Sequence, residues 1–102
     1  MEKIMRSKER TKDTVIRRDE RSDGGYAYRY ELISRESESV ASFGIALYSV
    51  RVELTSPSGE VTSAEANDVF ADAGRAILFY EKLVRNLATP VDLAYVAEDE
   101  LK

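Results

Sequence analysis

The feature that most constrains the fold of this chain is an alternation that begins at Tyr26. Large apolar residues occupy every second position from there to Leu32, and mostly small or charged residues stand between them. A repeat of two residues, with an aromatic side and a polar side, is typical of a strand that is buried on one face. The alternation therefore predicts a β-strand over residues 26–35.

The next apolar run, residues 40–54, is also rich in strand-forming residues, but its phase changes. Bulky residues fall on odd positions up to Leu47 and on even positions from Tyr48 onward. Because a shift of one residue moves every side chain to the other face, this change predicts a bulge or a strong bend near residues 47–49. The run is interpreted as one bent strand.

A turn and a third strand are expected next. The sequence Ser56-Pro57-Ser58-Gly59 has proline at its second and glycine at its fourth position, as a type I turn prefers. Residues 60–66 then form a weaker strand that contains two alanines and two glutamates. The sequence thus predicts a three-stranded antiparallel meander, with strands at about 26–35, 40–54 and 60–66.

Two helices are expected after the sheet. Apolar residues three or four apart over residues 69–86 indicate an amphipathic helix. Asp68 or Asp72 is suited to be its N-cap, because a short carboxylate accepts a backbone N–H. Thr89, followed by a proline, predicts the N-cap of a second helix over residues 90–101. Two helices packed on one face of a small antiparallel sheet give an α+β fold.

The first 25 residues differ from the rest of the chain. They carry only two isolated pairs of large apolar side chains, which cannot offset an ordering cost of about 1–2 kcal/mol per residue. Residues 1–25 are therefore predicted to be a charged, disordered tail, with an edge strand over residues 14–18 as the alternative. Asp23-Gly24-Gly25 is a cluster of turn-forming residues, and it is taken as the start of a single small domain over residues 26–102.

The composition favours binding over catalysis. The 102 residues include no histidine and no cysteine, which removes the side chain that titrates nearest neutrality, the commonest transition-metal ligand and the softest nucleophile. Residues 24–102 hold seven Lys or Arg against thirteen Asp or Glu, and an acidic domain repels nucleic acid. No apolar run is long enough to cross a membrane or to act as a secretion signal, so a cytoplasmic location is expected.

Three tyrosines are candidates for an interaction surface. Tyr26, Tyr28 and Tyr30 share one side of the first predicted strand. A tyrosine ring with its polar tip suits a protein interface as well as a core. A platform for stacking RNA bases is disfavoured, because such platforms are accompanied by basic residues and this domain is acidic.

An acidic cluster is the second candidate. Glu98, Asp99 and Glu100 lie near the end of the last predicted helix, where negative charge opposes the helix dipole. The cluster is interpreted either as a site for a hard cation or a basic partner, or as solvated or ion-paired surface. The arginines considered as its ion-pair partners are Arg51, Arg75 and Arg85.

Several short motifs resemble one protein family. They are Phe43-Gly44-Ile45, the stretch from Ala76 to Leu83, Thr89-Pro90-Val91-Asp92-Leu93, and the stretch from Val96 to Leu101. Over about residues 28–101 the chain is similar to the uncharacterised bacterial domain-of-unknown-function family 6514. The resemblance implies a short bacterial protein, and it implies no activity, cofactor or site residue.

The sequence therefore predicts a small, non-catalytic protein-interaction module with no cofactor and no catalytic or metal-binding residue. Its partner is expected to be an unknown protein or a second copy, as in a homodimer. One alternative is a cation-dependent module or enzyme that uses the acidic cluster. Another is association with nucleic acid through the N-terminal tail, which carries eight Lys or Arg and six Asp or Glu over residues 1–23.

Overall fold

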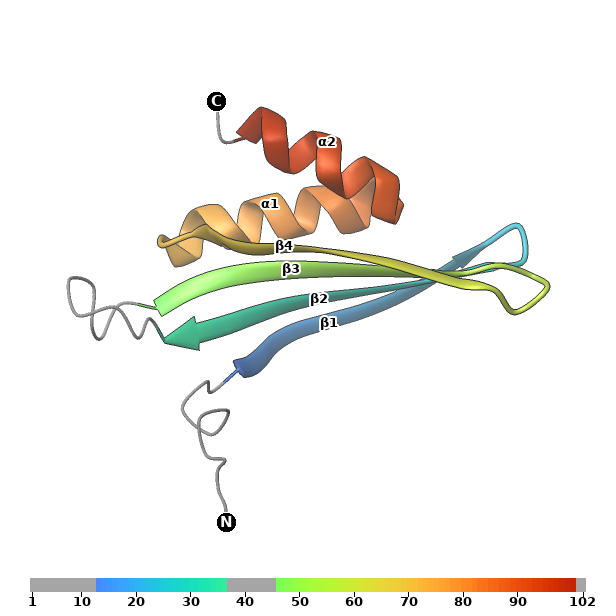
Figure 1. Ribbon diagram of the computed structural model, residues 1–102, viewed down its shortest axis with the longest axis horizontal. Helices are drawn as coiled ribbons and strands as arrows, with labels where there is room; N and C mark the ends of the chain where they lie inside the picture. Colours follow the sequence, from blue (N-terminus) through green and yellow to red (C-terminus); the bar gives the residue numbers. More distant parts are fainter. Residues whose placement is uncertain (1–12, 37–45, 101–102) are drawn as a thin grey trace, which may run out of the picture.

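Four antiparallel strands and two helices follow one another along the chain (Figure 1). The computed structural model describes residues 13–36 and 46–100. The elements are β1 (Asp13–Asp23), β2 (Tyr26–Glu36), β3 (Ala46–Thr55), β4 (Val61–Phe70), α1 (Ala73–Arg85) and α2 (Pro90–Glu100). The strands are neighbours in the order β1-β2-β3-β4. The predicted α+β class, with an antiparallel sheet and two C-terminal helices, is confirmed, but the sheet has four strands rather than three.

The additional strand, β1, lies in the segment that the sequence predicted to be a disordered tail. It pairs with β2 from Asp13 to Asp23, and it includes the stretch 14–18 considered as a short edge strand. The turn that joins them consists of Gly24 and Gly25, with φ of 60° and 87°. Positive φ at both central residues is what a two-residue type I′ hairpin requires. The glycine pair is therefore a hairpin turn within the sheet.

The irregularity predicted near residues 47–49 is present, but it lies on the neighbouring strand. β2 and β3 pair in one continuous register. Between β3 and β4, Tyr48 is opposite Phe70 while Val50 is opposite Ala66, so the extra residues belong to β4. Asp68 adopts a positive φ of 52° there, and its backbone N–H donates to Ser49 Oγ at 2.9 Å. Phe43 and Ile45, on which the phase argument also depended, lie outside the described residues.

Because β4 continues to Phe70, α1 begins at Ala73 and not near residue 69 as predicted. Asp72 is its N-cap and accepts the backbone N–H of Arg75 at 2.8 Å. At the start of α2, Thr89 and Asp92 each accept the other's backbone N–H, at 3.2 and 3.0 Å. Such a reciprocal capping box confirms Thr89 as the second N-cap. Neither helix in the described part of the chain has the length and apolarity needed to cross a membrane.

The core lies between the helices and the even-numbered side chains of β2 and β3. α1 packs over β2, β3 and β4, and α2 lies chiefly against β4 and to a lesser extent against β3. The largest fully buried side chains of this helix face are Tyr30, Leu32, Val50, Val52, Tyr80, Leu83 and Leu93. The hydroxyl of Tyr30 donates to the carbonyl of Ala88 at 2.9 Å, which ties β2 to the connection between α1 and α2. β1 is left at the margin of this core (Figure 1).

Candidate protein-interaction site

The three candidate tyrosines do not form one exposed surface. Tyr30 is fully buried with an exposed fraction of 0%, so its ring belongs to the core and is excluded from any surface of this fold. Burial raises the pKa of the Tyr30 hydroxyl to about 12. Tyr28 is half-buried and stacks on Tyr30, with ring centroids 6.2 Å apart and an interplanar angle of 8°. Tyr26 is 41% exposed, and among the three it alone is classed as exposed.

The acidic cluster lies at the C-terminal end of α2. Glu98 and Asp99 are exposed, and the side chain of Glu100 lies outside the described residues. In the described part of the chain, no group of three acidic, histidine or cysteine residues converges to hold a metal. Arg51 was one of the expected ion-pair partners of this acidic cluster, but it pairs instead with Glu31 and Glu65.

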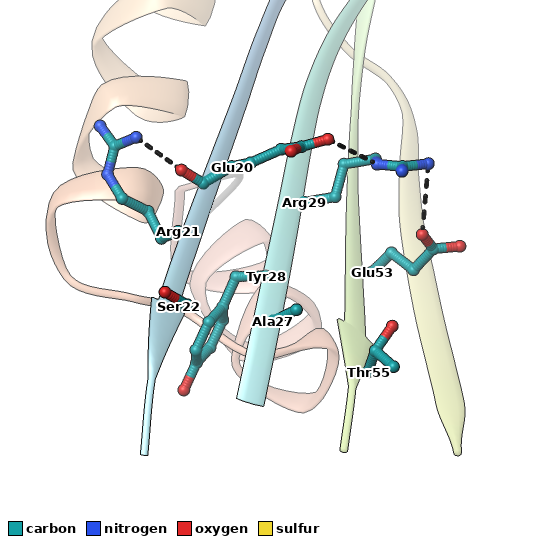
Figure 2. Close-up of a pocket in the computed structure, with 8 residues that line it drawn as sticks. All are labelled: Glu20, Arg21, Ser22, Ala27, Tyr28, Arg29, Glu53 and Thr55. Atoms are coloured by element: carbon teal, nitrogen blue, oxygen red, sulfur yellow. Dashed lines mark hydrogen bonds and ion pairs between the residues drawn. The ribbon is translucent and has the colours of Figure 1, made fainter. Parts of the chain in front are cut away.

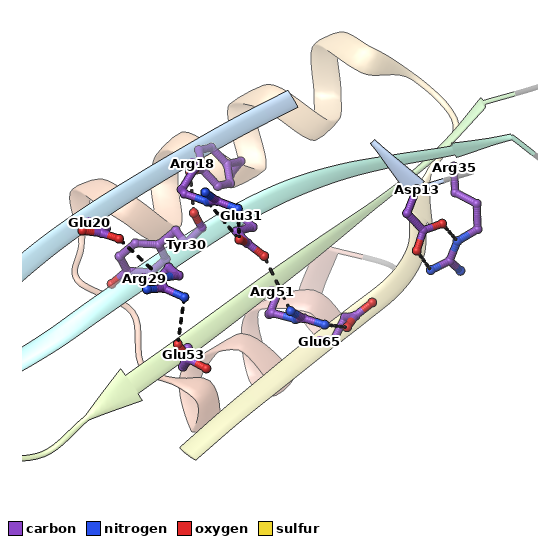
Figure 3. A network of polar contacts seen from close by, with 11 residues as sticks. Asp13, Arg18, Glu20, Arg29, Tyr30, Glu31, Arg35, Arg51, Glu53 and Glu65 are labelled. Atoms are coloured by element: carbon purple, nitrogen blue, oxygen red, sulfur yellow. Dashed lines mark hydrogen bonds and ion pairs between the residues drawn. The ribbon is translucent and has the colours of Figure 1, made fainter. Parts of the chain in front are cut away.

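The sheet face opposite the helices, named here the charged face, carries a row of alternating charges across all four strands. Arg18, Glu31, Arg51 and Glu65 are directly opposite one another in the strand register (Figure 3). Arg18 Nη2 lies 2.9 Å from Glu31 Oε2, and Arg51 lies 3.7 Å from Glu31 and 3.4 Å from Glu65. The two arginines enclose Glu31, which is only 7% exposed.

A second row runs parallel to the first. Arg29 lies 3.4 Å from Glu20 on β1 and 3.6 Å from Glu53 on β3 (Figure 3). A shallow hollow of about 340 Å³ lies beside this row, near the β1–β2 turn (Figure 2). Two cations line it: Arg29 already has two carboxylate partners, and Arg21 lies 3.9 Å from Asp19. The charges of this face are thus mutually compensated, which leaves little net charge to attract a ligand.

On the helix face, β1 presents charged side chains beside α1. The Tyr80 hydroxyl lies 2.7 Å from Asp19 Oδ2, to which it donates, and 3.1 Å from the carbonyl of Tyr30. The guanidinium of Arg17 lies 5.5 Å from the centre of the Tyr80 ring and 3.5 Å from Glu81. Burial, followed by the hydrogen bond to Asp19, raises the pKa of Tyr80. These contacts attach β1 to the helix layer through polar groups.

A groove of about 270 Å³ runs between β1 and α1, and is named here the β1–α1 groove. Its charged lining residues are Arg17, Asp19, Arg21, Glu81 and Arg85. Three of these side chains are positive and two are negative, so the groove has an excess of positive charge within an acidic chain. In the described part of the chain, Arg85 has no ion-pair partner, and the exposed Arg21 lies 3.9 Å from Asp19.

β1, which contributes Arg17, Asp19 and Arg21 to this groove, is an edge strand of the sheet. Within the described residues β1 pairs only with β2, so its other side has backbone groups without a strand partner. The pairing is irregular between Val15 and Arg17 and regular from residue 17 to residue 23. This regular stretch is named here the β1 edge. Free N–H and C=O groups along an edge strand can bind an added strand, which is association rather than chemistry.

The β1 edge was missed by the sequence reasoning because its strand has no buried apolar side. Two signals were available. A glycine pair between two runs favours a two-residue hairpin. In addition, the charges on the two sides of the glycine turn are complementary. Arg18 is opposite Glu31, and Glu20 is opposite Arg29.

Comparison with known proteins yields a family but no characterised relative. Searches of curated proteins and of solved structures found no match to this chain. The model of a family of unknown function (DUF6514) matches residues 9–102, and the match includes all of β1. The chain belongs to this family of unknown function (DUF6514).

Proposed function

We propose that this protein is a non-catalytic association module that binds a protein partner by strand addition at the β1 edge. The observation that supports the proposal is the edge itself. An eleven-residue strand pairs on one side only within the described residues, and the core helices pack mainly over the other three strands. We expect the protein to act in this way in the bacterial cytoplasm.

The chemistry of the surroundings agrees with association. Among the described residues, no group of side chains is arranged to hold a metal ion. In the hollow on the charged face, Arg29 is already paired with two carboxylates. The exposed apolar side chains Val15 and Ile16, 43% and 42% exposed, lie beside the edge, where an added chain would cover them. Among residues 13–36 and 46–100, no comparable contact supports the cation-dependent alternative or the nucleic-acid alternative.

The test depends on which backbone groups of β1 point outward. Residues that flank a two-residue hairpin turn direct their backbone groups toward each other, and the direction alternates along an antiparallel strand. Counting from Asp23, the backbone groups of Ser22, Glu20 and Arg18 point outward. The carbonyl of Glu20 accepts a hydrogen bond from the Arg21 guanidinium at 2.9 Å, which an added strand would have to replace (Figure 2). Glu20→Pro therefore removes an outward N–H and obstructs an added strand, while the pairing with β2 is retained. Glu20→Ala is the matched control, because it removes the same carboxylate and keeps the N–H.

The measurement is binding by the full chain, as self-association in sedimentation velocity and as partners retained from an extract of the native cell. Wild type and Glu20→Ala are expected to associate, and Glu20→Pro is expected to lose association while its thermal unfolding remains cooperative. A folded Glu20→Pro variant that associates as strongly as Glu20→Ala would refute strand addition at this edge.

A further inference from the structure

We infer that the strand added at the β1 edge is β1 of a second copy, paired antiparallel about a two-fold axis at Glu20. This inference rests on the proposed function. On the helix face, charges of opposite sign stand at equal distances on either side of Glu20. Pairing about that residue places Arg17 opposite the partner's Asp23 and Asp19 opposite the partner's Arg21. The two-fold axis repeats both contacts, and opposite charges directly across a strand pair are stabilising.

Neighbouring registers are electrostatically worse. Pairing about Asp19 opposes Arg17 to the partner's Arg21, twice, and Asp19 to its own copy, and these three like-charge contacts outnumber the two contacts between Arg18 and the partner's Glu20. Pairing about Arg21 opposes Asp19 to the partner's Asp23 and Arg21 to its own copy. Like charges directly opposite each other are destabilising. The charge pattern thus selects the register about Glu20, which is also the register that pairs the whole β1 edge with itself.

One like-charge contact remains in the selected register, because Glu20 lies opposite the partner's Glu20 on the charged face. Each of these carboxylates is already 3.4 Å from Arg29 of its own sheet. Each also lies diagonal to the partner's Arg18, and diagonal neighbours are within reach of long side chains. Two cations therefore offset the repulsion at the centre.

The β1–α1 groove is consistent with this partner. Directly opposed residues of antiparallel strands point to the same face, so both helix layers lie on one side of the continuous eight-stranded sheet. The partner's Asp19 and Asp23 then approach the groove whose lining includes Arg17, Arg21 and Arg85. A contact of seven residues buries less surface than the roughly 1,600 Å² of a standard interface. The dimer is therefore expected to be weak and dependent on concentration.

Disulfide cross-linking tests the register in a chain that contains no natural cysteine. Directly opposed residues have Cα atoms about 4.5–5.5 Å apart, which permits a disulfide. Glu20→Cys is therefore expected to form a covalent dimer under mild oxidation. Arg18→Cys is the matched control, since its symmetric copy lies four residues further along the strand, about 13 Å away. We expect it to cross-link at least about tenfold more slowly. Equal rates for the two folded variants, or none for either, would overturn the register.

A charge exchange tests the partner independently of cysteine chemistry. Arg17→Asp alone and Asp23→Arg alone each create two repulsive contacts in a homodimer, and we expect each to weaken self-association about tenfold. An equimolar mixture restores every opposite-charge contact in the heterodimer, so association should return. A mixture that associates no better than the two variants alone would contradict the inference.

The two proposals can fail separately. If Glu20→Cys does not cross-link but Glu20→Pro still abolishes binding of another protein, the added strand belongs to that protein and the inference of a second copy is wrong. If Glu20→Pro also binds as the control does, strand addition at this edge is wrong as well.

Discussion

The hydrogen bond between Tyr80 and Asp19 holds β1 against α1, and we expect it to contribute measurably to the free energy of unfolding. Tyr80→Phe removes the hydroxyl and keeps the ring, so no cavity forms and Arg17 still lies over the aromatic face. Hydrogen bonds to charged groups contribute about 1.5–3 kcal/mol to the free energy of unfolding. Because the Asp19 side chain is 27% exposed and can regain water, we expect a loss around or slightly below the lower end of that range, about 1–2 kcal/mol.

In a chain of this size, such a loss lowers the melting temperature by about 5–15 °C. The free energy of unfolding is obtained from urea titrations followed by far-ultraviolet circular dichroism. Tyr95→Phe is the matched control, because Tyr95 is 67% exposed and its hydroxyl has no hydrogen bond in the described part of the chain. We expect this control to change the free energy of unfolding by less than about 0.5 kcal/mol.

A double-mutant cycle with Asp19→Ala separates the contact from other effects of either change. If the hydrogen bond stabilises the fold, the two substitutions together cost about 1 kcal/mol less than the sum of their separate costs. Strict additivity, within about 0.3–0.5 kcal/mol, would refute the reasoning. So would a Tyr80→Phe protein as stable as the Tyr95→Phe control.

Three further outcomes follow from the same contacts. The pKa of Tyr30 is about 12 in the fold and near 10 when unfolded, so its contribution to the free energy of unfolding should be constant below pH 10 and fall between pH 10 and 12. The slope from this group is about 1.4 kcal/mol per pH unit, and urea titrations at pH 9 and 11 should show it reduced in Tyr30→Phe. Glu31→Gln should lower the free energy of unfolding by about 1–2 kcal/mol, since it opens a nearly buried contact with two arginines, whereas Glu53→Gln should cost less than about 1 kcal/mol. Equal costs in the same titrations would show that burial of the first carboxylate is unimportant. Gly25→Ala should lower the melting temperature more than Gly24→Ala, because a Cβ at Gly25 would lie 3.1 Å from the proline ring of the β3–β4 turn and one at Gly24 meets nothing within 4 Å.

The elements that were predicted correctly are those whose own sequence pattern shows which side chains are buried or which residue caps the helix. β2 alternates because its even positions, such as Leu32, face the helices, and a period of two is a local signal. Thr89 was predicted as an N-cap, and Asp72 as one of two candidates, for the same reason, since a cap needs only the few residues that follow it. Local patterns were sufficient to predict the α+β class and the two helices.

The strand β1 was predicted only as an alternative, over residues 14–18, because neither of its sides is apolar. Its charged side pairs with β2, and its other side meets the hydroxyl of Tyr80, which lies more than fifty residues away in the sequence. The start of α1 was misplaced because Asp68 sits in the left-handed region inside β4, where its side chain suggested a helix cap. Both errors concern contacts that depend on residues distant in the sequence.

The candidate site shows the same limit. Alternation predicted that Tyr28 and Tyr30 share a side, but not that the helices would cover Tyr30 completely. The β1 edge could not be found before β1 itself was known to be a strand. Its self-complementary charges were present in the sequence. They indicate a possible partner only once residues 17–23 are known to be an extended strand that is unpaired on one side within the described residues.

The two rows of alternating charge have a consequence for how the chain finds its fold. Sliding β1 along β2 by two residues keeps every side chain on its own face, so hydrophobic burial cannot reject the error. In one direction the slip brings Glu20 opposite Glu31, and in the other it brings Arg18 opposite Arg29. Both misalignments set like charges against each other, whereas the native alignment pairs opposite charges in each row. The ion pairs of the charged face therefore favour the native alignment of β1 with β2 over a slip of two residues, which burial of apolar side chains does not distinguish.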